Sequence, residues 1–400
     1  MTKKYLIIPI ILTICITAIV VKTLLNFMNK KLYSNGTGVQ TSVQVVPSGN
    51  FLSPSPSCNL PPVPEDNEIT LLTDILYNTV GEKNLLLDVA MPKDIPDGVS
   101  LPLVVVFHGG GFAIGDKSTG GGAAQRRAIK QLAEKGYVAI SANYRLSRPG
   151  KNAYPAAVQD ARCVIRWARI NAAQYHIDPE RVAVTGASAG GGLASSVAVL
   201  EDDAVYHGAS LDAFDGFTCS ADIGHSDKAS SQVDGAVIYY GTSDFTIPLS
   251  SWGEVAPLIV NYLGEIPKEN SSQAKDASPI TWVSTSTPRI LLLHGKADDT
   301  VPYDQSVRFL SVLHNQRVNA NLVGLDGVGH SFLMFDADYL RKPEIDENLK
   351  KMPTCTGNES TGTTCKTELN EKTMIKIVNA LLPTSCASMT FLEKLFENGK

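Results

Sequence analysis

Short, continuously apolar runs recur through the middle of this chain, and amphipathic segments separate them. The runs that predict strands are residues 85–91, 101–109, 137–145, 181–186, 234–241, 289–295 and 320–327. Continuous apolar character, in place of strict alternation, is typical of strands that are covered on both faces. Strands that alternate with helices predict an α/β fold, in which a mostly parallel sheet carries helices on both sides.

The segments between these runs have the periodicity of helices. Between residues 155 and 175, Ala161, Val164, Ile165 and Ala168 fall at i, i+3, i+4 and i+7 and form one apolar stripe. The helices expected are residues 123–136, 155–175, 190–200, 304–314 and 369–382. In sheets of this kind the functional site lies at the carboxyl ends of the strands, so the residues that directly follow each strand are the candidates for functional residues.

Ser188 stands in the sequence GASAG, between an expected strand and an expected helix. The pattern G-x-S-x-G is typical of a sharp strand-to-helix turn that exposes a nucleophilic serine above a sheet. Small neighbours are needed because a larger side chain collides inside the turn. The alternative is a serine that caps an ordinary helix, and the strand–turn–helix context favours the nucleophile.

A serine hydroxyl needs a base that removes its proton, and the base needs an orienting carboxylate. His330 follows the last expected strand and is the candidate base, with a structural histidine as the alternative. Asp298 and Asp299 both follow the strand at 289–295. Asp298 is the preferred orienting acid, Asp299 is its rival, and a carboxylate that caps a turn or helix is the third interpretation.

The sequence HGGGF, residues 108–112, directly follows another expected strand. Attack on a carbonyl creates an oxyanion, which needs backbone N–H donors that no side chain crowds. Gly110 and Gly111 are expected to supply two such donors, and Ala189, next to the serine, a third. A flexible glycine turn is the alternative. A phosphate-binding loop is excluded because neither GxxxxGK[ST] nor GxGxxG is present.

Taken together, these motifs resemble the α/β-hydrolase superfamily, in its HGGG-type esterase and lipase branch. The chain order Ser188, Asp298, His330 is the order found there. The sequences NYRLS and ASPITWVS are also similar to that branch, and HGKADDTVPYDQS is most similar to carbohydrate-acyl-esterase and feruloyl-esterase-like members. The resemblance spans about residues 85 to 335.

The resemblance implies an eight-stranded, mostly parallel sheet, no metal or other cofactor, and a structural pair between Arg145 and Asp160. It implies a carboxylesterase, a serine hydrolase that cleaves small or medium acyl esters through an acyl-enzyme. Two alternatives stay open: an amide hydrolase, kynurenine-formamidase-like or a peptidase, and a non-enzymatic anchored binding protein on a hydrolase scaffold. Polar insertions near residues 201–232 and 339–368 depart from the family pattern, so the acyl and alcohol parts of a substrate are not carried over.

The first residues differ from the rest of the chain. Lys3 and Lys4 precede an uncharged stretch, residues 5–21, that Lys22 closes. This layout predicts a signal anchor or a cleaved signal peptide over residues 1–33. The Pro- and Ser-rich residues 34–67 predict a linker, and residues 68–400 a catalytic domain. We therefore expect an extracytoplasmic protein, either secreted or bound to the membrane through this one segment.

The net charge of the chain bears on its partners, and its cysteine content bears on disulfides and metal binding. The 400 residues carry a net charge of −5 without a basic cluster, which argues against a nucleic-acid partner; oligomeric state is not predicted. Six cysteines follow the N-terminal segment, and six allow 15 pairings. The one pairing expected is Cys355 with Cys365, against free thiols as the alternative. No cysteine or histidine spacing indicates zinc.

Overall fold

The computed structural model describes residues 44–45, 69–118, 124–222, 229–268, 271–325, 328–330, 354–356, 364–366, 387–389 and 391–396. The chain forms two compact units, one of residues 1–40 with 342–376 and one of residues 41–341 with 377–400. In the described part of the first unit, β12 (Thr354–Thr356) and β13 (Thr364–Lys366) form an antiparallel pair. The other described elements belong to the second unit.

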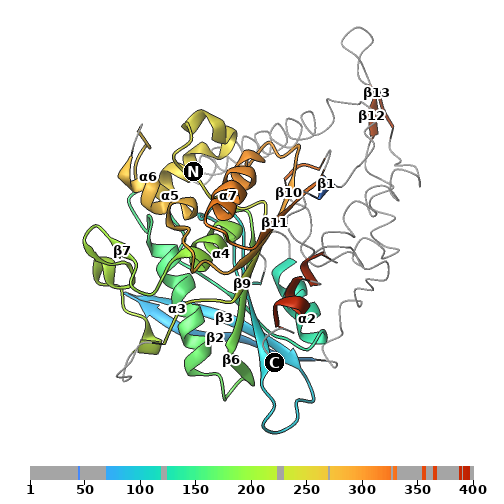
Figure 1. Ribbon diagram of the computed structural model, residues 1–400. Coiled ribbons are helices and arrows are strands. Elements are labelled where there is room, and N and C mark those ends of the chain that lie inside the picture. The colour runs from blue at the N-terminus through green and yellow to red at the C-terminus, as the bar shows by residue number, and fades with distance from the viewer. Residues whose placement is uncertain are drawn as a thin grey trace, which may run out of the picture. The chain divides into compact units, whose positions relative to one another are not determined.

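The described residues of the second unit form a nine-stranded sheet with the order β1-β11-β10-β9-β6-β4-β5-β3-β2 (Figure 1). Its strands are β1 (Gln44–Val45), β2 (Ile69–Val80), β3 (Lys83–Pro92), β4 (Leu101–Phe107), β5 (Val138–Ala142), β6 (Ile177–Ala187), β9 (Gly235–Tyr239), β10 (Arg289–Gly295) and β11 (Ala320–Leu325). Neighbours from β5 through to β11 pair in parallel, whereas β1, β2 and β3 pair antiparallel. The predicted mostly parallel sheet is confirmed, and β1 adds a ninth strand at its edge.

Helices cover both faces of this sheet. They are α2 (Ala124–Glu134), α3 (Ala156–Ile170), α4 (Ala189–Val199), α5 (Ala256–Leu263), α6 (Ser272–Ala277) and α7 (Asp304–Asn315), with 3-10 turns η1 (Leu211–Gly216), η2 (Ser220–Asp222), η3 (Leu249–Val255) and η4 (Pro279–Trp282). On β4, Leu103 and Val105 face the cluster that holds α3, α4 and α7, whereas Val104 and Val106 face α2 and residues 391–396. All four side chains are fully buried, which explains why this strand is continuously apolar.

Some predicted elements differ from the structure or lie outside it. β2 is an edge strand that the apolar runs did not predict, and α3 ends at Ile170 instead of continuing to residue 175. The expected segment at 1–33 and the expected helix at 369–382 lie outside the described residues, as does the linker apart from β1. Within the described ranges, no helix is long and apolar enough to cross a membrane.

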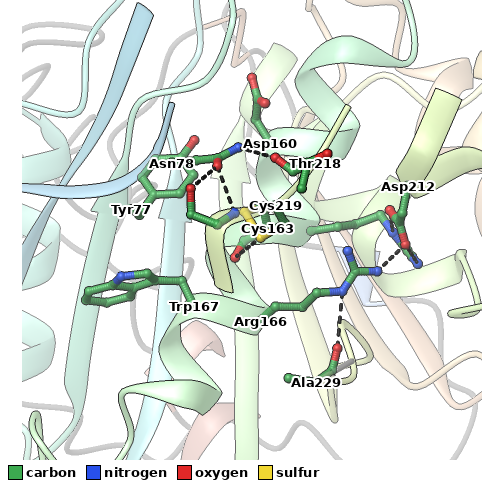
Figure 2. Close-up of a disulfide and its surroundings, with 12 residues drawn as sticks. Tyr77, Asn78, Asp160, Cys163, Arg166, Trp167, Asp212, Thr218, Cys219 and Ala229 are labelled. Carbon is green, nitrogen blue, oxygen red and sulfur yellow. Dashed lines mark hydrogen bonds and ion pairs between the residues drawn. A yellow bond between two sulfur atoms is a disulfide. The ribbon is translucent and has the colours of Figure 1, made fainter. Parts of the chain in front are cut away.

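The insertion near residues 201–232 is tied to α3 and β2. It begins with a hairpin, β7 (Val205–Tyr206) and β8 (Ala209–Ser210), and continues through η1 and η2. The Asp212 carboxylate accepts from Arg162 Nε at 2.8 Å and also pairs with Arg166 (Figure 2). Asn78 Nδ2 of β2 donates to the Thr218 carbonyl at 3.2 Å. These contacts hold the insertion on the same side of the sheet as α3.

A disulfide joins Cys163 of α3 to Cys219 of this insertion (Figure 2). Both residues are buried, at 0% and 1% exposure. The sequence left this pairing among the 15 possible ones. The pairing that it did favour, Cys355 with Cys365, concerns side chains outside the described part of the structure, although the backbone of β12 and β13 sets the two residues directly opposite each other.

Candidate active site

Ser188 is the single residue between a strand and a helix, as the sequence predicts. β6 ends at Ala187 and α4 begins at Ala189. Ser188 has φ 56° and ψ −123°, a backbone conformation that residues with a Cβ rarely adopt and that clusters at functional sites. Its amide donates to the Tyr239 carbonyl of β9 at 3.0 Å. This bond to the neighbouring strand holds the turn in its strained form.

The two glycines of the motif are required by close contacts within the turn. A Cβ on Gly186 would lie 2.3 Å from the carbonyl oxygen of Gly190. A Cβ on Gly190 would lie 2.1 Å from the carbonyl oxygen of Phe107, the last residue of β4. Helix α4 can therefore start this close to the sheet only because these positions lack side chains.

The three candidate residues meet at the carboxyl ends of β6, β10 and β11. The hydroxyl Oγ of Ser188 lies 3.1 Å from His330 Nε2, and His330 Nδ1 lies 2.7 Å from Asp298 Oδ2. The carboxylate can only accept, so Nδ1 carries the hydrogen. In the neutral ring Nε2 is then bare and accepts the hydrogen of the Ser188 hydroxyl. This is the arrangement in which a histidine can remove a serine proton.

Asp298 is held on both carboxylate oxygens, and its side chain is 0% exposed. Oδ1 accepts from the amides of Thr300 and Val301, each at 2.9 Å, and Oδ2 lies 3.2 Å from His294 Nε2. Burial by itself raises the pKa of Asp298, but the hydrogen bonds from His294 and His330 and the charge of His330 outweigh it and hold that pKa well below its usual range. The carboxyl is therefore ionised when His330 needs a counter-charge.

Asp299, the rival candidate, takes a different position. Its side chain is exposed, and its Oδ1 accepts from Thr300 Oγ1 at 3.3 Å. Among the two aspartates, it is Asp298 whose carboxylate contacts His330. The preference for Asp298 over Asp299 agrees with this geometry.

The loops that carry the acid and the histidine are joined through their backbones. The amide of Ala297 donates to the Val328 carbonyl at 3.0 Å. A Cβ on Gly295 would lie 2.2 Å from the same carbonyl oxygen, so this approach requires glycine. The ring of Tyr240 stands edge-on to the His330 ring at 4.7 Å. Burial raises the pKa of Tyr240, so an uncharged phenol packs beside the base.

The glycine loop after β4 adjoins the serine. A Cβ on Gly109 would lie 3.5 Å from the Cβ of Ser188. Gly110 and Gly111 have φ +114° and +58°, which only glycine adopts without strain. Among the described residues, the amides of Gly110, Gly111 and Ala189 donate no backbone hydrogen bond outside the helices and strands. Their part in an oxyanion hole stays a prediction.

Residues that follow β5 fix the glycine loop in place. The ring of His108 stacks on Tyr144 at 4.2 Å, and Tyr144 Oη donates to the His108 carbonyl at 2.8 Å. The amide of Ser147 donates to the Phe112 carbonyl at 2.8 Å. The expected pair of Arg145 with Asp160 is present, with Nε 2.9 Å from Oδ2, and it anchors this supporting segment to α3.

The sequence did not single out His294, although it stands four residues before Asp298 and bonds to it. No local pattern relates a histidine inside a buried strand to a carboxylate beyond the strand end. The backbone donors of Thr300 and Val301 likewise depend on the turn that follows Asp298. Among the described residues, no group of three or more histidine, cysteine, aspartate and glutamate side chains is arranged to hold a metal ion.

Several proteins that are similar to this chain carry the names of esterases. The chain is 30% identical over 242 residues to "Probable carboxylic ester hydrolase LipM" and 29% identical over 260 residues to "Esterase LipQ", both of Mycobacterium tuberculosis (strain ATCC 25618 / H37Rv). The matches cover 60% and 64% of this chain, but 51% and 56% of the relatives. The chain therefore spans about half the length of these curated relatives.

A solved structure described as "Truncated form of carbohydrate esterase from gut microbiota" superposes with a TM-score of 0.55 at 25% identity, over 67% of this chain and 91% of that one. The expected α/β-hydrolase fold is confirmed by this likeness and by the sheet order. A family model described as BD-FAE matches residues 87–313, the span from β3 to α7. Because this span is more than half of the 400 residues, the chain belongs to the BD-FAE family.

Proposed function

We propose that this protein is a serine hydrolase that cleaves carboxylic esters of small or medium acyl groups. The observation that carries the proposal is the unbroken hydrogen-bonded series from Ser188 Oγ through His330 to Asp298, at 3.1 and 2.7 Å. The esterase names of the relatives support the same class of reaction. The proposal needs no metal or other cofactor, since the nucleophile, the base, the acid and the oxyanion donors that it invokes all belong to the chain.

In this mechanism Ser188 Oγ attacks the ester carbonyl while His330 Nε2 takes the hydroxyl proton. Asp298 stabilises the imidazolium that forms. The amides of Gly110, Gly111 and Ala189 stabilise the oxyanion. His330 then protonates the leaving alcohol, and an acyl group remains on Ser188. Water attacks the acyl-enzyme with His330 again as the base, which releases the acid and restores the serine.

The finer parts of the proposal concern substrate and location. The similarity to a solved carbohydrate esterase supports sugar esters as the first natural class to assay. We also propose an extracytoplasmic site of action, with the apolar stretch at residues 5–21 as an anchor or as a cleaved signal. The buried disulfide of Cys163 and Cys219 supports such a compartment, because disulfides persist in oxidising environments.

The experiment compares the wild type with Ser188→Ala on p-nitrophenyl acetate and butyrate and with a fluorophosphonate probe. We expect wild-type labelling and turnover, and a loss of kcat of about a millionfold in the variant. Ser195→Ala is the matched control, because Ser195 lies on α4 with its hydroxyl bonded to the Gly191 carbonyl at 2.9 Å. A folded wild type without labelling or turnover would refute the proposal.

A further inference from the structure

His294 is a second histidine at the acid of the site. It lies near the end of β10, is 0% exposed, and bonds through both ring nitrogens. Nδ1 lies 2.7 Å from Ser306 Oγ on α7, and Nε2 lies 3.0 Å from the Val301 carbonyl and 3.2 Å from Asp298 Oδ2. The ring thus connects the acid to a strand and a helix that the reaction itself does not touch.

The neighbours of the two ring nitrogens determine which nitrogen of His294 carries the hydrogen. Both neighbours of Nε2, a carbonyl oxygen and a carboxylate oxygen, can only accept, so Nε2 carries a hydrogen shared between them. In the neutral ring Nδ1 is then bare, and the Ser306 hydroxyl donates to it. The Val301 carbonyl and the Asp298 carboxylate therefore select the tautomer, and the Ser306 hydroxyl stabilises it by its hydrogen bond to Nδ1.

We infer that His294 is a positioning residue for the hydrolysis proposed above, on which this inference rests. Asp298 Oδ2 then has two donors, His330 and His294, while the two backbone amides occupy Oδ1. With all of these in place the carboxylate cannot rotate, and His330 meets it in one orientation. The N–H of His294 also draws electron density from Oδ2, so that the proton stays on His330 when the imidazolium forms.

His294 and His330 both donate to Asp298 Oδ2. This competition sets the direction in which the loss of His294 changes the pH profile of kcat/KM. Without the His294 donor, the Asp298 carboxylate interacts more strongly with the imidazolium of His330 that forms in the reaction. The acidic limb of the kcat/KM profile then moves to higher pH. Among the described residues, the other titratable groups that face this network are Tyr240, edge-on to His330, and Tyr303, whose ring stands edge-on to His294 at 5.5 Å. Lys296 and Asp299 share the acid loop.

The test compares His294→Leu, His294→Gln and Ser306→Ala in the full chain, with p-nitrophenyl acetate as substrate. For His294→Leu we expect kcat to fall by about 10- to 100-fold, with KM little changed and the acidic limb at higher pH. A glutamine amide can reach the position of Nε2 and donate to Asp298, so we expect His294→Gln to restore most of the rate and the wild-type limb. Ser306→Ala should show a smaller change in the same direction.

His314→Leu is the matched control, since His314 on α7 bonds through Nε2 to the Ala320 carbonyl at 3.0 Å, outside the site. If His294→Leu keeps the wild-type kcat and acidic limb, the inference is overturned. If His294→Leu does not fold, Ser306→Ala decides. A wild-type kcat and a wild-type acidic limb of the kcat/KM profile overturn the inference, whereas a lower kcat with the acidic limb at higher pH supports it. A wild type that neither labels nor turns over overturns the proposed function and this role together.

Discussion

At the scale of single residues, the choice between two neighbouring aspartates can be tested directly. In Asp298→Asn the carboxamide oxygen takes the place of Oδ1 and accepts from the Thr300 and Val301 amides, which turns the NH₂ group toward His330. The ring must then present Nδ1 as an acceptor and carry its hydrogen on Nε2, so it cannot accept from Ser188. We expect kcat to fall by about 10⁴-fold, measured on p-nitrophenyl acetate.

Asp299→Asn is the comparison for that variant, because the Asp299 side chain is exposed and bonds to Thr300 Oγ1. It should keep wild-type kcat. Equal losses in the two variants would contradict the assignment of the acid to Asp298. Ser188, Asp298 and His330 were predictable because each stands in a short motif directly after an apolar strand. His294 was not, since its role depends on where the side chain of Asp298 turns.

At the scale of elements, the disulfide between α3 and the insertion gives a prediction of stability. Cys163 and Cys219 are 56 residues apart, and a covalent bond across a segment of that length reduces the conformational entropy of the unfolded chain. The double variant Cys163→Ala with Cys219→Ala should lower the free energy of unfolding by about 2–4 kcal/mol. Denaturant unfolding followed by circular dichroism measures this loss.

The same double variant should keep Ser188 reactive with the fluorophosphonate probe, because no triad residue bonds to the insertion in the described structure. An unchanged unfolding midpoint would mean that the contacts of Asp212 with Arg162 and Arg166 hold the insertion without the bridge. The test thus separates the covalent tie from the ionic one.

Strands that are buried on both faces were predictable from their continuous apolar runs, whereas the edge strand β2 was not. It lies at the edge of the sheet, and its exposed and buried positions are mixed. Its register against β3 shifts between Leu72 and Ile75, where Asp74 has a positive φ of 59°. A bulged edge strand therefore lacks both the unbroken apolar run of a central strand and the regular alternation of a half-buried one.

At the scale of the whole molecule, the last described residues return to the sheet from far along the sequence. The ring of Phe396 lies 6.0 Å from Tyr137, and a Cβ on Gly235 would lie 2.6 Å from Leu395 Cδ2. Residues 391–396 thus cover the face that also carries α2. Local periodicity indicates which face of a segment is apolar, but not which distant segment covers it, so this packing was not predictable.

The stability of the whole fold should depend on pH through His108. This residue is 1% exposed, and burial lowers its pKa to about 4, whereas an unfolded histidine has a pKa of about 6.5. Between these values the unfolded chain binds a proton that the folded chain does not, so stability falls as pH falls through this window. The full loss from this one group is about 3 kcal/mol at pH 4.

His108→Phe removes this proton but can keep the ring stack on Tyr144. It loses the Nδ1–H bond to the Gly109 carbonyl, 2.8 Å in the wild type, so the variant should be less stable at pH 7. Its unfolding free energy should nevertheless change less than that of the wild type between pH 7 and 4.5. Urea unfolding at pH 7, 5.5 and 4.5 measures both. Parallel pH curves for the variant and the wild type would show that His108 is not the group whose protonation opposes folding between pH 7 and 4.5.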